Sequence, residues 1–390
     1  MNRDERLIIV GGGPAGLATA RAYRNAGGLA RVEILSTESY PPYNRPPLTK
    51  DFLRGESNRE DLPMETEDWY RENDVGLRLS TVVEALDRER AVVETDAGER
   101  FSYDACVLAT GSEPVRIPVP GADDPEILVM RTLENSARLR ERVGKGDRAV
   151  VVGSGFIGCE AAASLSLRGA DVTLVSLEEV PQGERLGGEV GGRIRGWLED
   201  YGVDLRLGTA LEGIERRDGG YSVAVEGGED ISAGTVLFGT GVEPRLGLAE
   251  GAGLEVEGGV VTDSSMRTSG PGVFAIGDIA SAFNESAGRH VSVEHWGDAL
   301  EHGRIAGTVI AGGEATWSMA PGFWSTIGEK TLKYWSGDGG WDERAFEDRG
   351  ESFVVRYGCD GALVGILTHG ADEDYEEGRE PIERGDPFPG

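Results

Sequence analysis

The chain has 390 residues, which is enough for two or three domains. Its net charge of −30 argues against a nucleic-acid partner, and it contains no run of about 18 apolar residues that would predict a membrane span. Cys106, Cys159 and Cys359 form no Cys-x-x-Cys pair, and the N-terminus does not resemble a secretory signal. We therefore expect a cytoplasmic protein without a disulfide framework.

The first predicted elements surround a glycine-rich motif. A buried strand at 6–10 precedes it, and a helix at 17–26 and a strand at 32–36 follow; the motif itself reads Gly11-Gly12-Gly13-Pro14-Ala15-Gly16. In a Gly-x-Gly-x-x-Gly turn the first glycine permits the turn, the second lets backbone approach a pyrophosphate, and the third lets the helix pack on the strand. The phosphates lie at the helix N-terminus, where free N–H groups favour negative charge.

The same order of elements occurs twice. In the first half a proline-rich loop spans 40–50, strands are predicted at 79–95 and 100–109 with a turn at Ala97-Gly98, and the segment 108–114 closes the unit. The second half has a strand at 148–152, a helix at 157–168, a strand at 171–175 and a closing segment at 237–244; its motif reads Gly153-Ser154-Gly155-Phe156-Ile157-Gly158. The glycine motifs are 142 residues apart and the closing Thr-Gly pairs 130, which indicates a duplicated unit. Two such motifs predict two dinucleotides that exchange electrons.

The chain then returns to the first unit. A buried strand at 273–278 ends in Gly277-Asp278, and residues 297–312 are predicted to be helical. The composition changes near Pro321, and strands at 352–357 and 362–367 predict a small C-terminal domain. Residues 371–390 are acidic and contain Pro and Gly, so we expect a poorly ordered tail.

Four segments carry a resemblance to a known family. They are Tyr43-Asn44-Arg45-Pro46-Pro47-Leu48-Thr49-Lys50, Gly277-Asp278, Glu294-His295-Trp296 and Phe323-Trp324-Ser325. The chain resembles the oxygenase-coupled ferredoxin reductases, the family of biphenyl dioxygenase reductase and putidaredoxin reductase, with apoptosis-inducing factor as a distant relative.

The resemblance implies an α/β fold with two Rossmann-like dinucleotide-binding domains and a small α+β C-terminal domain. The expected division is an FAD domain at 1–115 and 245–320, an NAD domain at 116–244, a C-terminal domain at 321–370 and the acidic tail at 371–390. The implied reaction is hydride transfer from NADH to FAD, followed by single-electron transfer to a ferredoxin-like [2Fe–2S] protein that supplies an oxygenase. The protein would act as a monomer or a homodimer.

The motifs and the resemblance also predict the residues that bind the cofactors. These are Gly11, Gly13, Pro14, Ala15, Gly16, Glu38, Arg45, Lys50, Val83, Ala109, Thr110, Gly111, Arg131, Gly277, Asp278, Glu294 and Trp296, together with Gly153, Gly155, Phe156, Ile157, Gly158, Glu160, Ser176 and Gly241. An acid after the second strand should bind the FAD ribose; Glu38 is the candidate, because Glu33 lies within the strand. A solvated loop glutamate is the alternative for Glu38, and a surface salt bridge is the alternative for Arg131.

Four residues are predicted to be catalytic by the same resemblance: Lys50, Glu160, Trp296 and Trp324. Lys50 and Glu160 would form an ion pair beside the flavin, where a lysine stabilises negative charge on the reduced ring. The alternatives are a helix-surface role for Glu160 and core packing for the tryptophans.

The second glycine motif departs from the family pattern at its ribose-binding position. Ser176 stands where an acid is usual, but residues 176–184 include no Arg or Lys to hold a 2′-phosphate, and Glu178, Glu179 and Glu184 would repel one. NADH is therefore favoured over NADPH. The four histidines form no evident metal site with Cys or carboxylates, so no metal is expected.

Two other functions remain open at this point. One is an NADH oxidase or a quinone or other small-acceptor reductase, because a charge of −30 does not suit an acidic ferredoxin. The other is a redox-responsive binding protein in which NADH changes conformation or association. The absence of a cysteine pair disfavours disulfide reduction.

Overall fold

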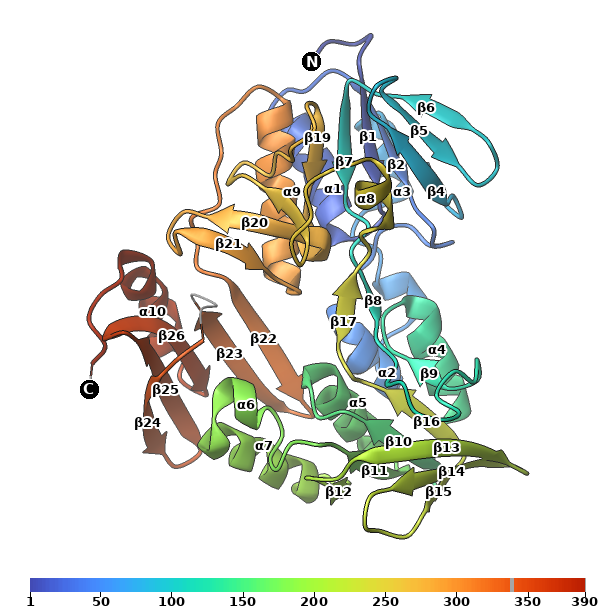
Figure 1. Ribbon diagram of the computed structural model, residues 1–390, viewed down its shortest axis with the longest axis vertical. Coiled ribbons are helices and arrows are strands. Elements are labelled where there is room, and N and C mark those ends of the chain that lie inside the picture. The colour runs from blue at the N-terminus through green and yellow to red at the C-terminus, as the bar shows by residue number, and fades with distance from the viewer. Residues whose placement is uncertain (337–339, 390) are drawn as a thin grey trace.

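The computed structural model describes residues 1–336 and 340–389. Figure 1 shows three groups of elements: most of the blue and cyan segments lie with the orange segment, most of the green segments lie at the opposite end, and the red C-terminal segment lies beside both. Segments far apart in sequence share one sheet: β19, near residue 273, pairs with β7, near residue 106.

The first parallel sheet carries the first glycine motif. Its strand order is β19-β7-β1-β2-β3, with bounds β1 (Arg6–Val10), β2 (Arg31–Leu35), β3 (Val75–Arg78), β7 (Ala105–Leu108) and β19 (Val273–Ala275). Helices α1 (Pro14–Asn25) and α9 (Trp296–Ile310) pack against each other beside it. Gly303 permits this close crossing, because a Cβ there would lie 2.3 Å from the carbonyl oxygen of Ala15.

The second parallel sheet has the same arrangement. Its strand order is β12-β11-β10-β16-β9, with bounds β9 (Leu128–Val129), β10 (Arg148–Val152), β11 (Asp171–Val175), β12 (Asp204–Arg206) and β16 (Thr235–Phe238). Its longer helices are α4 (Leu133–Arg142), α5 (Phe156–Leu167) and α7 (Gly188–Asp200). The four residues that end β10 are buried, as expected for a central strand covered on both faces.

Small antiparallel sheets and short helices complete these two units. The three-stranded sheets are β4 (Val83–Asp87), β5 (Val92–Thr95) and β6 (Arg100–Ser102); β13 (Leu211–Arg217), β14 (Gly220–Val225) and β15 (Ile231–Ala233); and β18 (Val260–Thr262), β20 (Ala280–Asn284) and β21 (Arg289–Ser292). A further pair consists of β8 (Ser112–Pro114) and β17 (Val242–Pro244). This pair runs between the two units in Figure 1. The short helices are α2 (Asp51–Arg54), α3 (Glu67–Glu72), α6 (Gly183–Leu186) and α8 (Gly247–Gly251), with 3-10 turns at Pro46–Thr49, Arg59–Asp61 and Gly277–Ile279.

The C-terminal part is a five-stranded antiparallel sheet covered by a helix. Its order is β22-β23-β26-β25-β24, with bounds β22 (Gly322–Ile327), β23 (Lys330–Ser336), β24 (Glu343–Arg349), β25 (Ser352–Cys359) and β26 (Ala362–His369). The predicted disordered tail at 371–390 is wrong, because α10 (Asp372–Arg384) is helical and packs on β26. The cause is specific pairing: the Trp335 and Tyr375 rings stack 4.9 Å apart, and Arg349 binds Asp374 at 2.7 Å. The acidic first turn also suits a helix N-terminus.

Two predicted strands are shorter than expected. The 79–95 segment is a hairpin, β4 and β5, whose turn includes Ala91 at φ 51°. The 100–109 segment is divided between β6 and β7, which belong to different sheets, whereas the turn at Ala97-Gly98 is confirmed. Among the described residues, no helix has both the length and the apolar character that a membrane crossing requires.

Candidate active site

Most of the residues predicted around the first glycine motif line one cavity of about 520 Å³. The predicted residues in its lining are Gly11, Gly13, Pro14, Ala15, Glu38, Arg45, Val83, Ala109, Thr110, Gly111, Arg131, Ile157, Gly277, Asp278, Glu294 and Trp296. Gly16 lies behind this lining in the first turn of α1. The cavity is therefore assembled from both sequence segments of the first sheet.

The glycines of this motif create room for a ligand. Gly11 has φ +126°, and a Cβ on it would lie 2.0 Å from the carbonyl oxygen of Ala109. A Cβ on Gly16 would lie 2.3 Å from the carbonyl oxygen of Gly11, so α1 begins close against β1. Apart from Gly13 and its chain neighbours, the described residues place no heavy atom within 4 Å of a Cβ built on Gly13, at the N-cap of α1. The open backbone at a helix N-terminus fits a pyrophosphate.

Charged side chains of the first cavity are held by one another. Glu38 accepts hydrogen bonds from Arg45 at 2.7 Å and from the Tyr43 hydroxyl at 2.6 Å, so it is not a free loop residue. Asp278 Oδ2 accepts from Arg131 Nη2 at 2.6 Å and from the Ser112 hydroxyl at 2.7 Å.

The Arg131 ion pair therefore faces the cavity with Asp278 and is not a surface contact, because the two side chains are 24% and 11% exposed. These carboxylates and guanidinium groups provide fixed polar partners for the hydroxyls and phosphates of a dinucleotide such as FAD.

A second cavity of about 290 Å³ adjoins the first. Its predicted residues are Lys50, Gly155, Phe156, Ile157, Glu160, Gly241, Glu294, Trp296 and Trp324. Five residues line both cavities: Pro46, Ile157, Glu294, His295 and Trp296. Gly153, Gly158 and the buried Ser176 lie outside the lining and shape the glycine loop. The two nucleotide-binding motifs therefore open onto adjacent spaces that share a wall.

Lys50 and Glu160 form an ion pair at the wall of the second cavity. The Lys50 ammonium lies 2.6 Å from Glu160 Oε2, and the side chains are 14% and 3% exposed. Residues 158–165 of helix α5 are buried, and the Glu160 side chain among them is only 3% exposed, so it does not lie on the outer surface of the helix. The helix-surface alternative is therefore excluded for Glu160.

Three further donors complete the contacts of the Glu160 carboxylate. Oε2 accepts from the Thr49 hydroxyl at 2.5 Å, and Oε1 accepts from the Ser325 hydroxyl at 2.7 Å and from the Thr326 backbone N–H at 3.0 Å. A buried carboxylate is stable only when it is paired and hydrogen-bonded, and this one is satisfied from two separate segments of the chain, 49–50 and 325–326.

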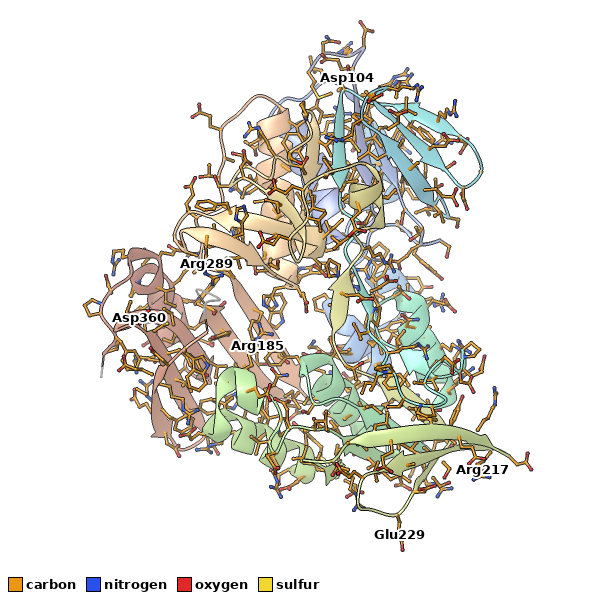
Figure 2. All side chains as sticks on the ribbon, viewed as in Figure 1. Asp104, Arg185, Arg217, Glu229, Arg289 and Asp360 are labelled. Carbon is orange, nitrogen blue, oxygen red and sulfur yellow. The ribbon has the colours of Figure 1, made fainter. Side chains whose placement is uncertain are left out.

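Sequence reasoning missed several residues of the second cavity. His295 lies between two predicted residues, and its ring packs 4.6 Å from that of Phe323. Burial, reinforced by Arg185, lowers the pKa of His295 to about 3, so its imidazole is neutral at pH 7. Arg185 lies near the middle of the molecule, where α6 faces strand β22 (Figure 2), and its guanidinium stacks 5.2 Å from the Phe323 ring. The position of His295 inside Glu294-His295-Trp296 was the available signal for it.

Trp324 and the cysteines have contrasting surroundings. Trp324 is 43% exposed in the second cavity, so it is not a core residue. The three cysteines are free, and burial raises the pKa of the Cys106 thiol to about 12 and that of Cys159 higher still. Buried thiols of this kind are poor nucleophiles.

Among the described residues, no group of three or more His, Cys, Asp or Glu side chains could hold a metal ion.

Comparison with known proteins agrees with this geometry. The model of the pyridine nucleotide-disulphide oxidoreductase family matches residues 5–303, and the chain belongs to this family. It is 34% identical over 328 residues to rubredoxin-NAD(+) reductase of Pseudomonas putida, covering 84% of this chain and 85% of that protein. It is 31% identical over 384 residues to the ferredoxin–NAD(+) reductase component of the anthranilate 1,2-dioxygenase system of Burkholderia cepacia, covering 97% and 94%.

A solved structure gives the same result at the level of the fold. The structure of the covalent complex of putidaredoxin reductase with putidaredoxin matches 99% of this chain and 94% of that one, with 29% identity and a TM-score of 0.93. The expected fold class and the resemblance to oxygenase-coupled reductases are therefore confirmed. The chain is an oxidoreductase of a family that uses FAD and NAD(H).

Proposed function

We propose that this protein transfers electrons from NADH through FAD to a small ferredoxin-like [2Fe–2S] protein that serves an oxygenase. The observation that carries the proposal is the pair of glycine-loop cavities with five shared lining residues and the Lys50–Glu160 ion pair beside them. The relatives named for rubredoxin and for a dioxygenase system support the same reaction class. Bound FAD supplies the ability to accept two electrons together and release them one at a time.

The residues of the first cavity suit the binding of FAD. Under the proposal, the open N-terminus of α1 at Gly13 binds the pyrophosphate, Glu38 binds the adenosine ribose, and Asp278 binds the ribityl chain. Residues 1–115 and 245–320 then act as one FAD domain, residues 116–244 as the NAD domain and residues 321–370 as a separate C-terminal domain.

Lys50 and Glu160 have distinct tasks in this proposal. The Lys50 ammonium provides a fixed positive charge in the lining of the second cavity, which favours negative charge developing there. Glu160 orients that ammonium and is itself fixed by Thr49 and Ser325. Trp296 and Trp324 limit the access of water to the space they line.

NADH is the preferred reductant in this proposal. Residues 176–184 contain no Lys or Arg, whereas they include three glutamates that oppose the extra phosphate of NADPH. The Arg185 guanidinium next to this segment stacks on Phe156 and Phe323, 5.8 and 5.2 Å from the ring centres. It places positive charge at the lining of the second cavity and not beside Ser176.

The test is anaerobic stopped-flow reduction of the FAD-loaded protein by NADH and by NADPH, followed by addition of a [2Fe–2S] ferredoxin or of rubredoxin. Fast flavin bleaching by NADH and prompt reoxidation by the ferredoxin support the proposal. Reoxidation only by quinone or oxygen would replace it with a small-acceptor reductase. Slow bleaching with a persistent long-wavelength band and NADH-dependent dimerisation would replace it with a redox-responsive binding protein.

A further inference from the structure

The first half of the chain has a characteristic turn after its second strand. The Ser36 N–H donates to the Arg78 carbonyl at 2.8 Å, and the Thr81 N–H donates to the Ser36 carbonyl at 2.8 Å. The Ser80 N–H donates to the Glu38 carbonyl at 3.1 Å, and the Glu38 N–H donates to the Ser36 hydroxyl at 3.3 Å. This turn brings Glu38 into the first cavity, two residues beyond Ser36.

The second half repeats the turn bond for bond. The Ser176 N–H donates to the Arg206 carbonyl at 3.0 Å, and the Thr209 N–H donates to the Ser176 carbonyl at 2.9 Å. The Gly208 N–H donates to the Glu178 carbonyl at 3.0 Å, and the Glu178 N–H donates to the Ser176 hydroxyl at 3.2 Å. Glu178 is therefore the internal equivalent of Glu38, and Ser176 is the equivalent of Ser36.

The Glu178 side chain lies over the second glycine loop. Its Oε2 accepts from the Ser154 hydroxyl at 2.7 Å and from the Gln182 N–H at 3.1 Å, and its Oε1 accepts from the Glu184 N–H at 3.4 Å. Ser154 is the second residue of the glycine motif, so the carboxylate is held against the loop that carries the nucleotide phosphates.

We infer that Glu178, and not Ser176, is the acid that hydrogen-bonds the adenosine ribose hydroxyls of NADH beside the second glycine loop. This inference deepens the proposed function and rests on it. Ser176 acts through Glu178, because its hydroxyl accepts the Glu178 N–H and contacts the Ser154 hydroxyl at 2.7 Å. The acid that is usual in the family at position 176, and that this chain lacks there, is therefore supplied two residues later.

Two independent observations support this position as an adenosine site. Leu177, between the two residues, is 72% exposed, so an apolar side chain is available for an adenine ring to cover. Among the described residues, no Lys or Arg forms an ion pair with Glu178, whereas Arg45 neutralises Glu38 in the first half. An unneutralised carboxylate accepts ribose hydroxyls and repels a 2′-phosphate.

The experiment measures binding of NAD⁺ and of NADP⁺ to the oxidised, FAD-loaded full chain by titration calorimetry. The variants are Glu178→Ala and the nearly isosteric Glu178→Gln. The matched control for NAD⁺ affinity alone is Glu179→Gln, because Glu179 is exposed and its carboxylate lies near the Gly208 backbone, on the side of β12. Far-UV circular dichroism and FAD content report whether each variant is folded.

We expect Glu178→Ala to weaken NAD⁺ binding about 10- to 100-fold, the loss of hydrogen bonds to a charged acceptor. Glu178→Gln should give a smaller loss, and NADP⁺ binding should hold or improve in both variants, so the discrimination between the nucleotides falls. NAD⁺ binding within twofold of the unaltered protein in both variants, or an equal loss in Glu179→Gln, would overturn the inference. Failure of the unaltered protein to bind NAD⁺ at all would instead overturn the proposed function.

Discussion

Replacement of Lys50 by Met tests the role of the ion pair in the lining of the second cavity. Two unit charges 2.6 Å apart attract by about 6 kcal/mol at an effective dielectric constant of about 20, before desolvation is subtracted. Methionine removes this attraction while keeping a long apolar side chain. Glu160 retains three neutral donors, and each hydrogen bond to its carboxylate is worth about 1.5–3 kcal/mol, so Glu160 stays partnered while the pocket loses the Lys50 charge.

The expected result is a slower transfer of hydride from NADH. Loss of one fixed electrostatic partner typically lowers such a rate about 10²- to 10³-fold. Anaerobic stopped-flow bleaching of the flavin measures the rate at saturating NADH, and titration with NAD⁺ separates weaker binding from slower reduction. The control is Lys330→Met, an exposed lysine at the start of β23, which should reduce at the original rate. A Lys50→Met protein that keeps its FAD and reduces within twofold of the original would refute the reasoning.

Three further changes have defined outcomes. Ser325→Ala removes one hydrogen bond to the Glu160 carboxylate and should slow flavin reduction about three- to tenfold, whereas Ser286→Ala at the β20–β21 turn should not. Equal rates in both would show that Ser325 is dispensable. The lowered pKa of His295, about 3, means that only the unfolded state binds its proton between pH 3 and 6.5. Stability should therefore fall as the pH drops through this window, and denaturant midpoints of His295→Phe should depend less on pH; an unchanged pH slope would contradict this. Removal of residues 371–390 uncovers Trp335, so it should lower the thermal midpoint of unfolding and shift tryptophan fluorescence to the red. Glu373→Gln should do neither. A truncated protein that melts at the original temperature would contradict the packing of α10.

The sequence predicted the two glycine-loop units well, because their signals are local. A buried strand, a glycine turn and a helix follow one another within about 20 residues, and the structure has β1 with α1 and β10 with α5 at those places. The pairing of Lys50 with Glu160 depended on the resemblance, since no local pattern connects residues 110 positions apart.

The errors arose where distant contacts decide the structure. The acidic segment 371–390 has the composition of a solvated tail, yet Trp335, Arg349 and Arg356 supply the partners that hold α10 on the sheet. The nucleotide-binding loop shows the same limit. The sequence shows only that Ser176 stands where the family usually has an acid, and the matching turns of the two halves become visible only through their backbone hydrogen bonds.

The contacts of Glu160 have a consequence for exchanging parts between related reductases. Two of its four donors, the Ser325 hydroxyl and the Thr326 N–H, belong to β22 and stand next to the exposed Trp324. A chimera that receives its C-terminal sheet from a relative also receives new residues at 325 and 326. Such a transplant would therefore change the hydrogen bonds to Glu160 and the surface around Trp324 at the same time. The environment of the Lys50–Glu160 pair and this surface cannot be exchanged separately.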